Sequence, residues 1–231
     1  MNAVITGASK GIGKAIALKL AQNGYNLAIC ARNEEELQHF AEELKAYGVR
    51  VFAIVADCSI KNDVFSFFEK VRAEMSTVDV LVNNVGNFLS ANILDEEDEI
   101  FESQQLLNVN AAYYLSKNFG KMMRSAKSGH IFNICSIASV QVVENAGSYS
   151  VTKAAMLSLN NVYRAALADY NIKVTAILPG STLTASWEGT KIPHQTFVQP
   201  EDVANSLYSI LTLSSGVNVD ELILTPLKFN N

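Results

Sequence analysis

Short apolar runs rich in β-branched residues recur along the chain, and segments with a helical period separate them. The apolar runs are 3–6, 26–30, 51–55, 78–82, 130–134, 173–178 and 221–224. The helical segments are 11–23, 34–47, 61–75, 98–126, 149–169 and 200–213. Strands that alternate with helices are typical of right-handed crossovers into a parallel sheet with helices on both faces. We therefore predict an α/β fold with a doubly wound, parallel, seven-stranded sheet.

The chain of 231 residues is expected to form one domain, 1–231, since α/β proteins of this size commonly have a single core and no linker divides this sequence. One long connection, 184–199, shows no clear element and holds the only tryptophan. It follows the sixth predicted strand, and ligands of open α/β sheets bind beyond the carboxyl ends of the strands. We predict that this connection covers a substrate.

The composition narrows the classes of partner. A net charge of −5 lacks the basic excess that nucleic-acid binding needs, so no nucleic-acid partner is expected. The three cysteines and three histidines are scattered without metal-ligand spacing, which predicts neither a disulfide framework nor a metal site. The chain has no basic leader and no long apolar run, so we expect a cytoplasmic protein with no membrane partner.

A glycine-rich loop follows the first predicted strand. Gly7, Gly11 and Gly13 in the stretch TGASKGIG allow a tight turn, a close approach of backbone to a ligand, and close packing of the next helix. The amino end of that helix offers free N–H groups to a pyrophosphate. The spacing GxxxGxG departs from the GxGxxG fingerprint, and a plain glycine-rich turn is the alternative. The position between a strand and an amphipathic helix favours dinucleotide binding.

The end of the second predicted strand bears on the choice of cofactor. A carboxylate there usually binds the ribose 2′-hydroxyl of NAD, whereas a basic residue accommodates a 2′-phosphate. Here the strand ends in Arg32, and Lys10 lies in the glycine loop. Two solvated surface cations are the alternative interpretation. We predict that Arg32 and Lys10 bind the phosphate of NADP(H), with NAD(H) less favoured.

Tyr149 and Lys153 stand four residues apart at the start of a predicted helix, so their side chains share one face. A nearby ammonium group favours the ionised form of a phenol and makes it a better acid. The alternative is a structural role, in which the tyrosine lies at the edge of the core and the lysine extends into solvent.

With these motifs the chain resembles the short-chain dehydrogenase/reductase family, whose fold is Rossmann-like. TGASKGIG resembles the family's cofactor loop, and NNVG resembles its NNAG motif, with Val85 in place of alanine. The resemblance implies the catalytic residues Asn110, Ser136, Tyr149 and Lys153. It also implies a cofactor site made of Gly7, Ser9, Lys10, Gly11, Ile12, Gly13, Arg32, Asp57, Cys58, Asn84, Gly86, Tyr149, Lys153, Pro179, Gly180, Thr182 and Thr184.

The resemblance implies an NADPH-dependent oxidoreductase that transfers hydride between nicotinamide and a carbonyl or alcohol. Tyr149 would be the general acid or base. An enzyme that reduces 3-oxoacyl groups on acyl carrier protein is one alternative, although the carboxyl end ELILTPLKFNN lacks the ending common among such enzymes. A non-catalytic NADP-binding protein is another. The resemblance also implies a homodimer or homotetramer, formed through the helices expected at 98–126 and 149–169.

Overall fold

The computed structural model describes residues 1–228 and contains one seven-stranded sheet. All strand pairs are parallel, and the order is β3-β2-β1-β4-β5-β6-β7. The strands are β1 (Asn2–Thr6), β2 (Asn26–Ala31), β3 (Val51–Val55), β4 (Val80–Asn83), β5 (Gly129–Ile134), β6 (Ile172–Pro179) and β7 (Glu221–Leu224). The predicted doubly wound sheet is confirmed.

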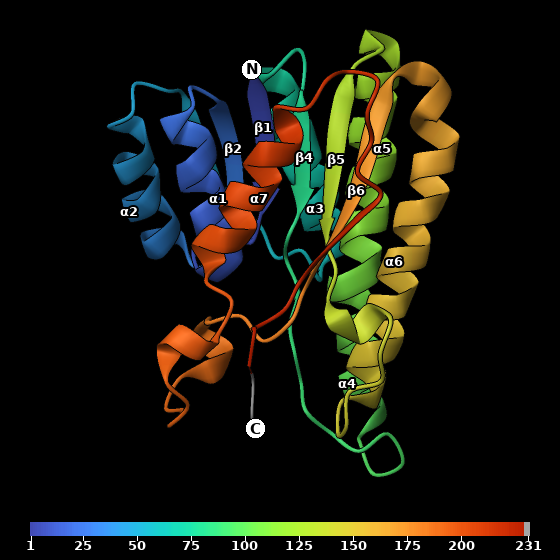
Figure 1. The fold of residues 1–231 in the computed structure, drawn as a ribbon. Helices are drawn as coiled ribbons and strands as arrows, with labels where there is room; N and C mark the ends of the chain where they lie inside the picture. Colours follow the sequence, from blue (N-terminus) through green and yellow to red (C-terminus); the bar gives the residue numbers. More distant parts are fainter. Residues whose placement is uncertain (229–231) are drawn as a thin grey trace.

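Helices cover both faces of this sheet (Figure 1). They are α1 (Gly11–Gln22), α2 (Glu34–Lys45), α3 (Lys61–Glu74), α4 (Asp98–Gln104), α5 (Ala111–Ala126), α6 (Gly147–Leu167) and α7 (Pro200–Leu211). The segment predicted as one helix over 98–126 is α4 and α5 joined by a π-helical turn, Gln105–Asn110. Such turns place an extra residue in the helix and occur often at functional sites.

Each strand sends successive side chains to opposite faces, so the sheet separates two hydrophobic cores. Ala3 and Ile5 of β1 pack in the core formed with α1, α2 and α7. Val4 packs in the opposite core, formed with α3 and α5. Both faces of the central strands are therefore buried, which explains why those strands read as continuous apolar runs.

The strand order reverses direction between β1 and β4. The chain builds β2 and β3 on one side of β1 and places β4 to β7 on the other. In open α/β sheets a crevice opens at such a reversal, beyond the carboxyl ends of the strands. This edge is the lower end of the sheet in Figure 1, where the loops after β1, β4 and β6 meet.

Among residues 1–228, no helix combines the length and the apolar character that crossing a membrane requires.

Candidate active site

An open cleft of about 960 Å³ runs along the carboxyl edge of the sheet. Most of the predicted site residues line this cleft. They are Gly7, Ser9, Lys10, Gly11, Ile12, Arg32, Cys58, Asn84, Gly86, Ser136, Tyr149, Lys153, Pro179, Gly180, Thr182 and Thr184. Gly13, Asp57 and Asn110 are not among the lining residues. The fold therefore gathers side chains from both halves of the chain into one site.

The glycine loop has the backbone geometry that the sequence predicts. Gly7 and Gly11 have φ of 64° and 54°, in the left-handed region that favours glycine. A Cβ on Gly13 would lie 2.3 Å from the carbonyl oxygen of Gly7. Gly13 is therefore required for close packing between the loop and α1, and it does not reach the cleft. The amino end of α1 faces the cleft through Gly11 and Ile12, a suitable place for a phosphate.

Hydrogen bonds between Thr6 and Asn84 fix the glycine loop to the end of β4. The Thr6 hydroxyl accepts hydrogen bonds from the backbone N–H groups of Asn84 and Val85, both at 3.1 Å. The Asn84 side-chain amide donates to the carbonyl oxygens of Thr6 and Gly7 at 2.9 and 3.0 Å. Asn84 thus lines the cleft and also braces the loop.

The cations predicted to bind a phosphate lie at one end of the cleft, but they have an acidic neighbour. Arg32 is exposed at the end of β2. The Lys10 ammonium group lies 2.8 Å from a carboxylate oxygen of Glu36, which also lines the cleft. Reasoning from sequence missed Glu36, although its position in the first turn of a helix that begins at the end of β2 was a usable signal.

Asp57, predicted as part of the cofactor site, makes local contacts. The Asp57 carboxylate accepts hydrogen bonds from the Ser59 N–H at 2.9 Å and from the Ser59 hydroxyl at 2.7 Å. Its neighbour Cys58 lines the cleft instead. In this structure Asp57 shapes the turn after β3, and Cys58 forms the surface at that point.

The three cysteines are buried and carry no disulfide. The sulfur atoms of Cys30 and Cys58 lie 3.8 Å apart. The hydrogen bond between these thiols, together with burial, raises the pKa of Cys30 well above its usual value. Burial likewise raises the pKa of Cys135 to about 12. Thiols held in the protonated form are poor nucleophiles, so Cys30 and Cys135 do not indicate covalent catalysis.

Lys153 and Tyr149 of α6 are held beside the end of β5. Lys153 is buried, and its ammonium group donates a hydrogen bond of 3.0 Å to the carbonyl oxygen of Ile134. The same nitrogen lies 5.7 Å from the centroid of the Tyr149 ring. The ring of Phe88 packs edge-on against Tyr149, with 5.0 Å between centroids. The alternative of a lysine reaching for solvent is therefore excluded.

Ser136 lines the same cleft and follows the last residue of β5 by two positions. Its hydroxyl accepts a hydrogen bond of 3.1 Å from the Ala138 N–H, as the cap of a short 3-10 helix. This contact holds the oxygen in place at the cleft and leaves the hydroxyl proton available for a ligand.

The asparagine next to Lys153 is Asn108, not the predicted Asn110. A Cβ on Gly86 would lie 3.0 Å from the side-chain amide oxygen of Asn108 and 3.5 Å from the Nζ of Lys153. The buried Asn108 side chain also contacts both backbone polar groups of Asn87 and the hydroxyl of Thr152.

The side-chain amide oxygen of the predicted Asn110 instead accepts a hydrogen bond from Gln105. Residues two apart on a helix point to nearly opposite sides, so only one of the pair can face Lys153.

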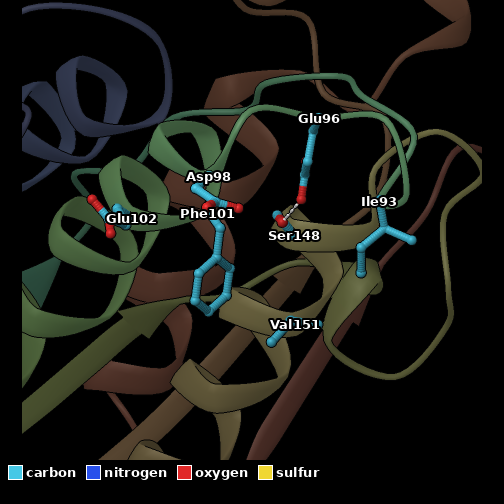
Figure 2. Close-up of a pocket in the computed structure, with 7 residues that line it drawn as sticks. All are labelled: Ile93, Glu96, Asp98, Phe101, Glu102, Ser148 and Val151. Atoms are coloured by element: carbon cyan, nitrogen blue, oxygen red, sulfur yellow. Dashed lines mark hydrogen bonds between the residues drawn. The ribbon is translucent and has the colours of Figure 1, made fainter.

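The first turn of α6 is braced from outside the cleft. Figure 2 shows a small pocket beside this turn, where the Ser148 hydroxyl donates a hydrogen bond to the Glu96 carboxylate. A Cβ on Gly147 would lie 2.7 Å from the Ile93 side chain. The loop between β4 and α4 therefore packs closely on the turn that carries Tyr149.

The connection 184–199 contains two short 3-10 helices, Ala185–Trp187 and His194–Thr196. Backbone hydrogen bonds between Leu183 and Val198, and between Val198 and Ser181, join its two ends. The Trp187 ring packs on Phe197 with 4.9 Å between centroids. The segment 184–187 lines the cleft, and the Thr184 methyl group would lie 3.2 Å from a Cβ on Gly11. This connection therefore reaches the glycine loop across the cleft.

Within residues 1–228, no group of three or more histidine, cysteine or acidic side chains is placed to hold a metal ion. The protein thus combines a doubly wound α/β sheet with a cleft that is lined by a glycine loop and by the pair of Tyr149 and Lys153.

Comparison with known proteins identifies the class. The family model for short chain dehydrogenases matches residues 1–193. An uncharacterized oxidoreductase of Staphylococcus aureus (strain USA300) is 31% identical over 224 residues, which cover 97% of this chain and 96% of the relative.

Two of the similar solved structures, which match over nearly their whole length, bear on the cofactor. One is an alcohol dehydrogenase from the archaeon Thermococcus sibiricus complexed with 5-hydroxy-NADP, with 29% identity, a TM-score of 0.91, and 100% and 98% of the two chains covered. The other is L-sorbose reductase from Gluconobacter frateurii complexed with NADPH and L-sorbose, with the same identity and TM-score and 97% and 95% covered. The chain belongs to the short-chain dehydrogenase family of oxidoreductases.

Proposed function

We propose that this protein is an NADP(H)-dependent oxidoreductase that interconverts a small carbonyl compound and its alcohol. One observation supports this proposal above the others: Ser136, Tyr149 and the buried Lys153 line the same cleft as the glycine loop. NADP(H) is the favoured cofactor because Lys10 and Arg32 line the far end of that cleft, and because the similar dehydrogenase and sorbose reductase are complexed with NADP compounds.

The cofactor fits the residues that are present. Positive φ at Gly7 and Gly11 opens the loop toward the cleft, and the amino end of α1 would hold the pyrophosphate. Gly86 leaves room beside Lys153, which would hold the nicotinamide ribose. When bound, the nicotinamide supplies or accepts the hydride.

Each side chain of the site has a chemical task in this proposal. The carbonyl oxygen gains negative charge as the hydride arrives, and Tyr149 donates a proton to it. The Ser136 hydroxyl donates a hydrogen bond to the same oxygen and stabilises the developing charge. Lys153 lies beside the Tyr149 ring and would bind the cofactor there. Asn108, in place of the predicted Asn110, positions the groups around Lys153.

Substitution of Tyr149 by phenylalanine tests the proposal. The change removes the proton donor and keeps the ring that packs on Phe88. We expect kcat to fall by about 10² to 10⁴, the usual contribution of general acid catalysis, while the dissociation constant of NADPH changes little. Turnover of diketones, aldehydes, β-ketoesters and 3-oxoacyl thioesters is measured with NADPH and with NADH.

Near-normal kcat in the Tyr149→Phe variant would contradict the role of Tyr149. Absence of turnover by the unmodified protein would favour the non-catalytic alternative.

The substrate end of the cleft gives less support to a carrier-protein substrate. Glu144 is the one charged side chain among the lining residues there besides Lys153. Among the described residues that line this end of the cleft, the cation is the buried Lys153, so an acidic carrier protein or a phosphopantetheine arm would meet no exposed lining cation there. Small neutral or polyhydroxylated carbonyl compounds suit this surface better.

The proposed enzyme is a homo-oligomer that works in the cytoplasm, where its unbridged thiols suit a reducing environment. Support for assembly comes from exposed apolar side chains on α4, α5, α6 and the π-helical turn. On α6, Val151, Ala154, Ser158 and Val162 form an exposed stripe of small and apolar residues along one face. A stripe of this kind permits close packing against a helix of a second copy.

A further inference from the structure

Glu36 sits where the proposed cofactor carries its distinguishing group. It lines the same end of the cleft as Lys10, Arg32 and Asn33. Its carboxylate pairs with the Lys10 ammonium group at 2.8 Å, and both side chains are partly exposed. Lys10 is thus one of two cations available to a 2′-phosphate, and it already has an anionic partner.

The local structure holds Glu36 in this position. Asn33 caps α2, and its side-chain oxygen accepts a hydrogen bond of 3.0 Å from the Glu36 N–H. The first turn of α2 follows directly from β2, so the carboxylate stands close to the strand end that carries Arg32. The cap therefore fixes the backbone at Glu36, and the ion pair with Lys10 orients the carboxylate.

We infer that Glu36 is a residue that determines cofactor specificity: its carboxylate competes with the 2′-phosphate of NADP(H) for Lys10 and so limits the preference for NADP(H) over NAD(H). A phosphate dianion that enters between Lys10 and Arg32 meets a second anion on the same lysine. Like charges weaken each other's binding, whereas the 2′-hydroxyl of NAD(H) carries no charge and can donate a hydrogen bond to a carboxylate. This inference rests on the proposed function, since it concerns the phosphate site of the same cleft.

The expected change in cofactor affinity follows from the solvent exposure of the Lys10–Glu36 pair. Exposed ion pairs contribute modest free energies, and the corresponding change in affinity is about two- to fivefold. Glu36→Gln should therefore tighten binding of the phosphorylated cofactor by about two- to fivefold, without improving binding of the unphosphorylated one. Added salt should reduce this gain, because the charges are open to solvent.

The test uses two fragments that differ only in the 2′-phosphate. Adenosine 2′,5′-bisphosphate and adenosine 5′-monophosphate are titrated calorimetrically into the full-length protein and into Glu36→Gln, at low and at high salt. Glu43→Gln is the matched control, because it breaks the similar exposed pair of Lys14 and Glu43, which is not among the residues that line the cleft. We expect tighter binding of the bisphosphate by Glu36→Gln alone, with no tightening of the monophosphate.

Two results would overturn the inference. Unchanged or weaker bisphosphate binding by Glu36→Gln would show that the carboxylate does not compete, or that it positions Lys10 for the phosphate. Equal tightening by Glu43→Gln would show a general effect of net charge. Failure of the unmodified protein to bind the bisphosphate, with the monophosphate still bound, would instead remove the phosphate site on which the proposed function depends. The two failures are thus distinguishable.

Discussion

At the scale of single residues, two asparagines in the stretch LLNVN are expected to differ in their effect on catalysis. Asn108 is buried against Thr152 and the backbone of Asn87, close to Lys153. Asn110 is only partly buried and pairs with Gln105. The two variants Asn108→Ala and Asn110→Ala therefore remove amides of the same size, one inside the site and one outside it.

We expect Asn108→Ala to lower kcat by a factor of about 10² and to shift the pH profile of kcat, because the groups around Lys153 lose the hydrogen bonds that hold them in place. Asn110→Ala should leave both nearly unchanged. Steady-state kinetics with NADPH across a pH series, together with thermal unfolding of both variants, measure this difference. The reverse order of effects would restore the assignment made from sequence alone.

This pair shows what the sequence can and cannot predict at this scale. Tyr149 and Lys153 were identified together because a spacing of four residues holds on any regular helix. The choice between Asn108 and Asn110 depends on which side of the helix faces α6. The π-helical turn over 105–110 changes which side chains lie on that side. The ion pair of Lys10 with Glu36 was equally hidden, because residues 26 apart meet only through the contact of two elements.

At the scale of elements, strand and helix positions were predictable because buried parallel strands are short continuous apolar runs. The connection 184–199 was predictable as an irregular segment but not in its conformation. That conformation depends on contacts far along the chain, such as Thr184 with Gly11. Whether the connection covers a substrate, as its place at the cleft suggests, stays a prediction.

The exposed stripe on α6 predicts how copies of the chain associate. Val162→Arg puts a long charged side chain on this stripe, and we expect it to shift the protein from oligomer to monomer. Tyr47→Arg is the control, because Tyr47 is also exposed but follows α2, at the opposite end of the sheet in Figure 1. Sedimentation velocity at several concentrations measures the states. A monomeric unmodified protein, or a Val162→Arg variant that stays associated, would contradict assembly through α6.

At the scale of the whole molecule, a buried histidine couples folding to pH. His130 lies at the start of β5, where its Nε2 is 2.8 Å from the Thr175 hydroxyl and its ring stacks on Phe132. Burial, and secondarily the charge of Lys173 on the neighbouring strand, lowers the pKa of His130 from 6.5 to about 3. The native state therefore keeps this ring neutral in mildly acidic solution.

The sign of the effect follows from proton binding. Between pH 6.5 and about 3, the unfolded chain binds a proton at His130 and the folded protein does not. His130 therefore lowers the free energy of unfolding as the pH falls through this window, and this loss of stability is complete below about pH 3. From pH 7.5 to pH 5.5 this one group should reduce the free energy of unfolding by about 1.4 kcal/mol.

His130→Gln removes the titrating ring and keeps a polar group near Thr175. We expect the variant to be less stable at pH 7.5, because a packed ring is lost, yet to lose about 1.4 kcal/mol less than the unmodified protein on transfer to pH 5.5. Urea unfolding at one protein concentration and both pH values measures these differences. His39→Gln, at an exposed position of α2, is the control, because it removes a histidine and leaves His130 in place. Equal pH dependence in the His130 variant would mean that the folded protein protonates this ring, and that the core around β5 admits charge more readily than its packing indicates.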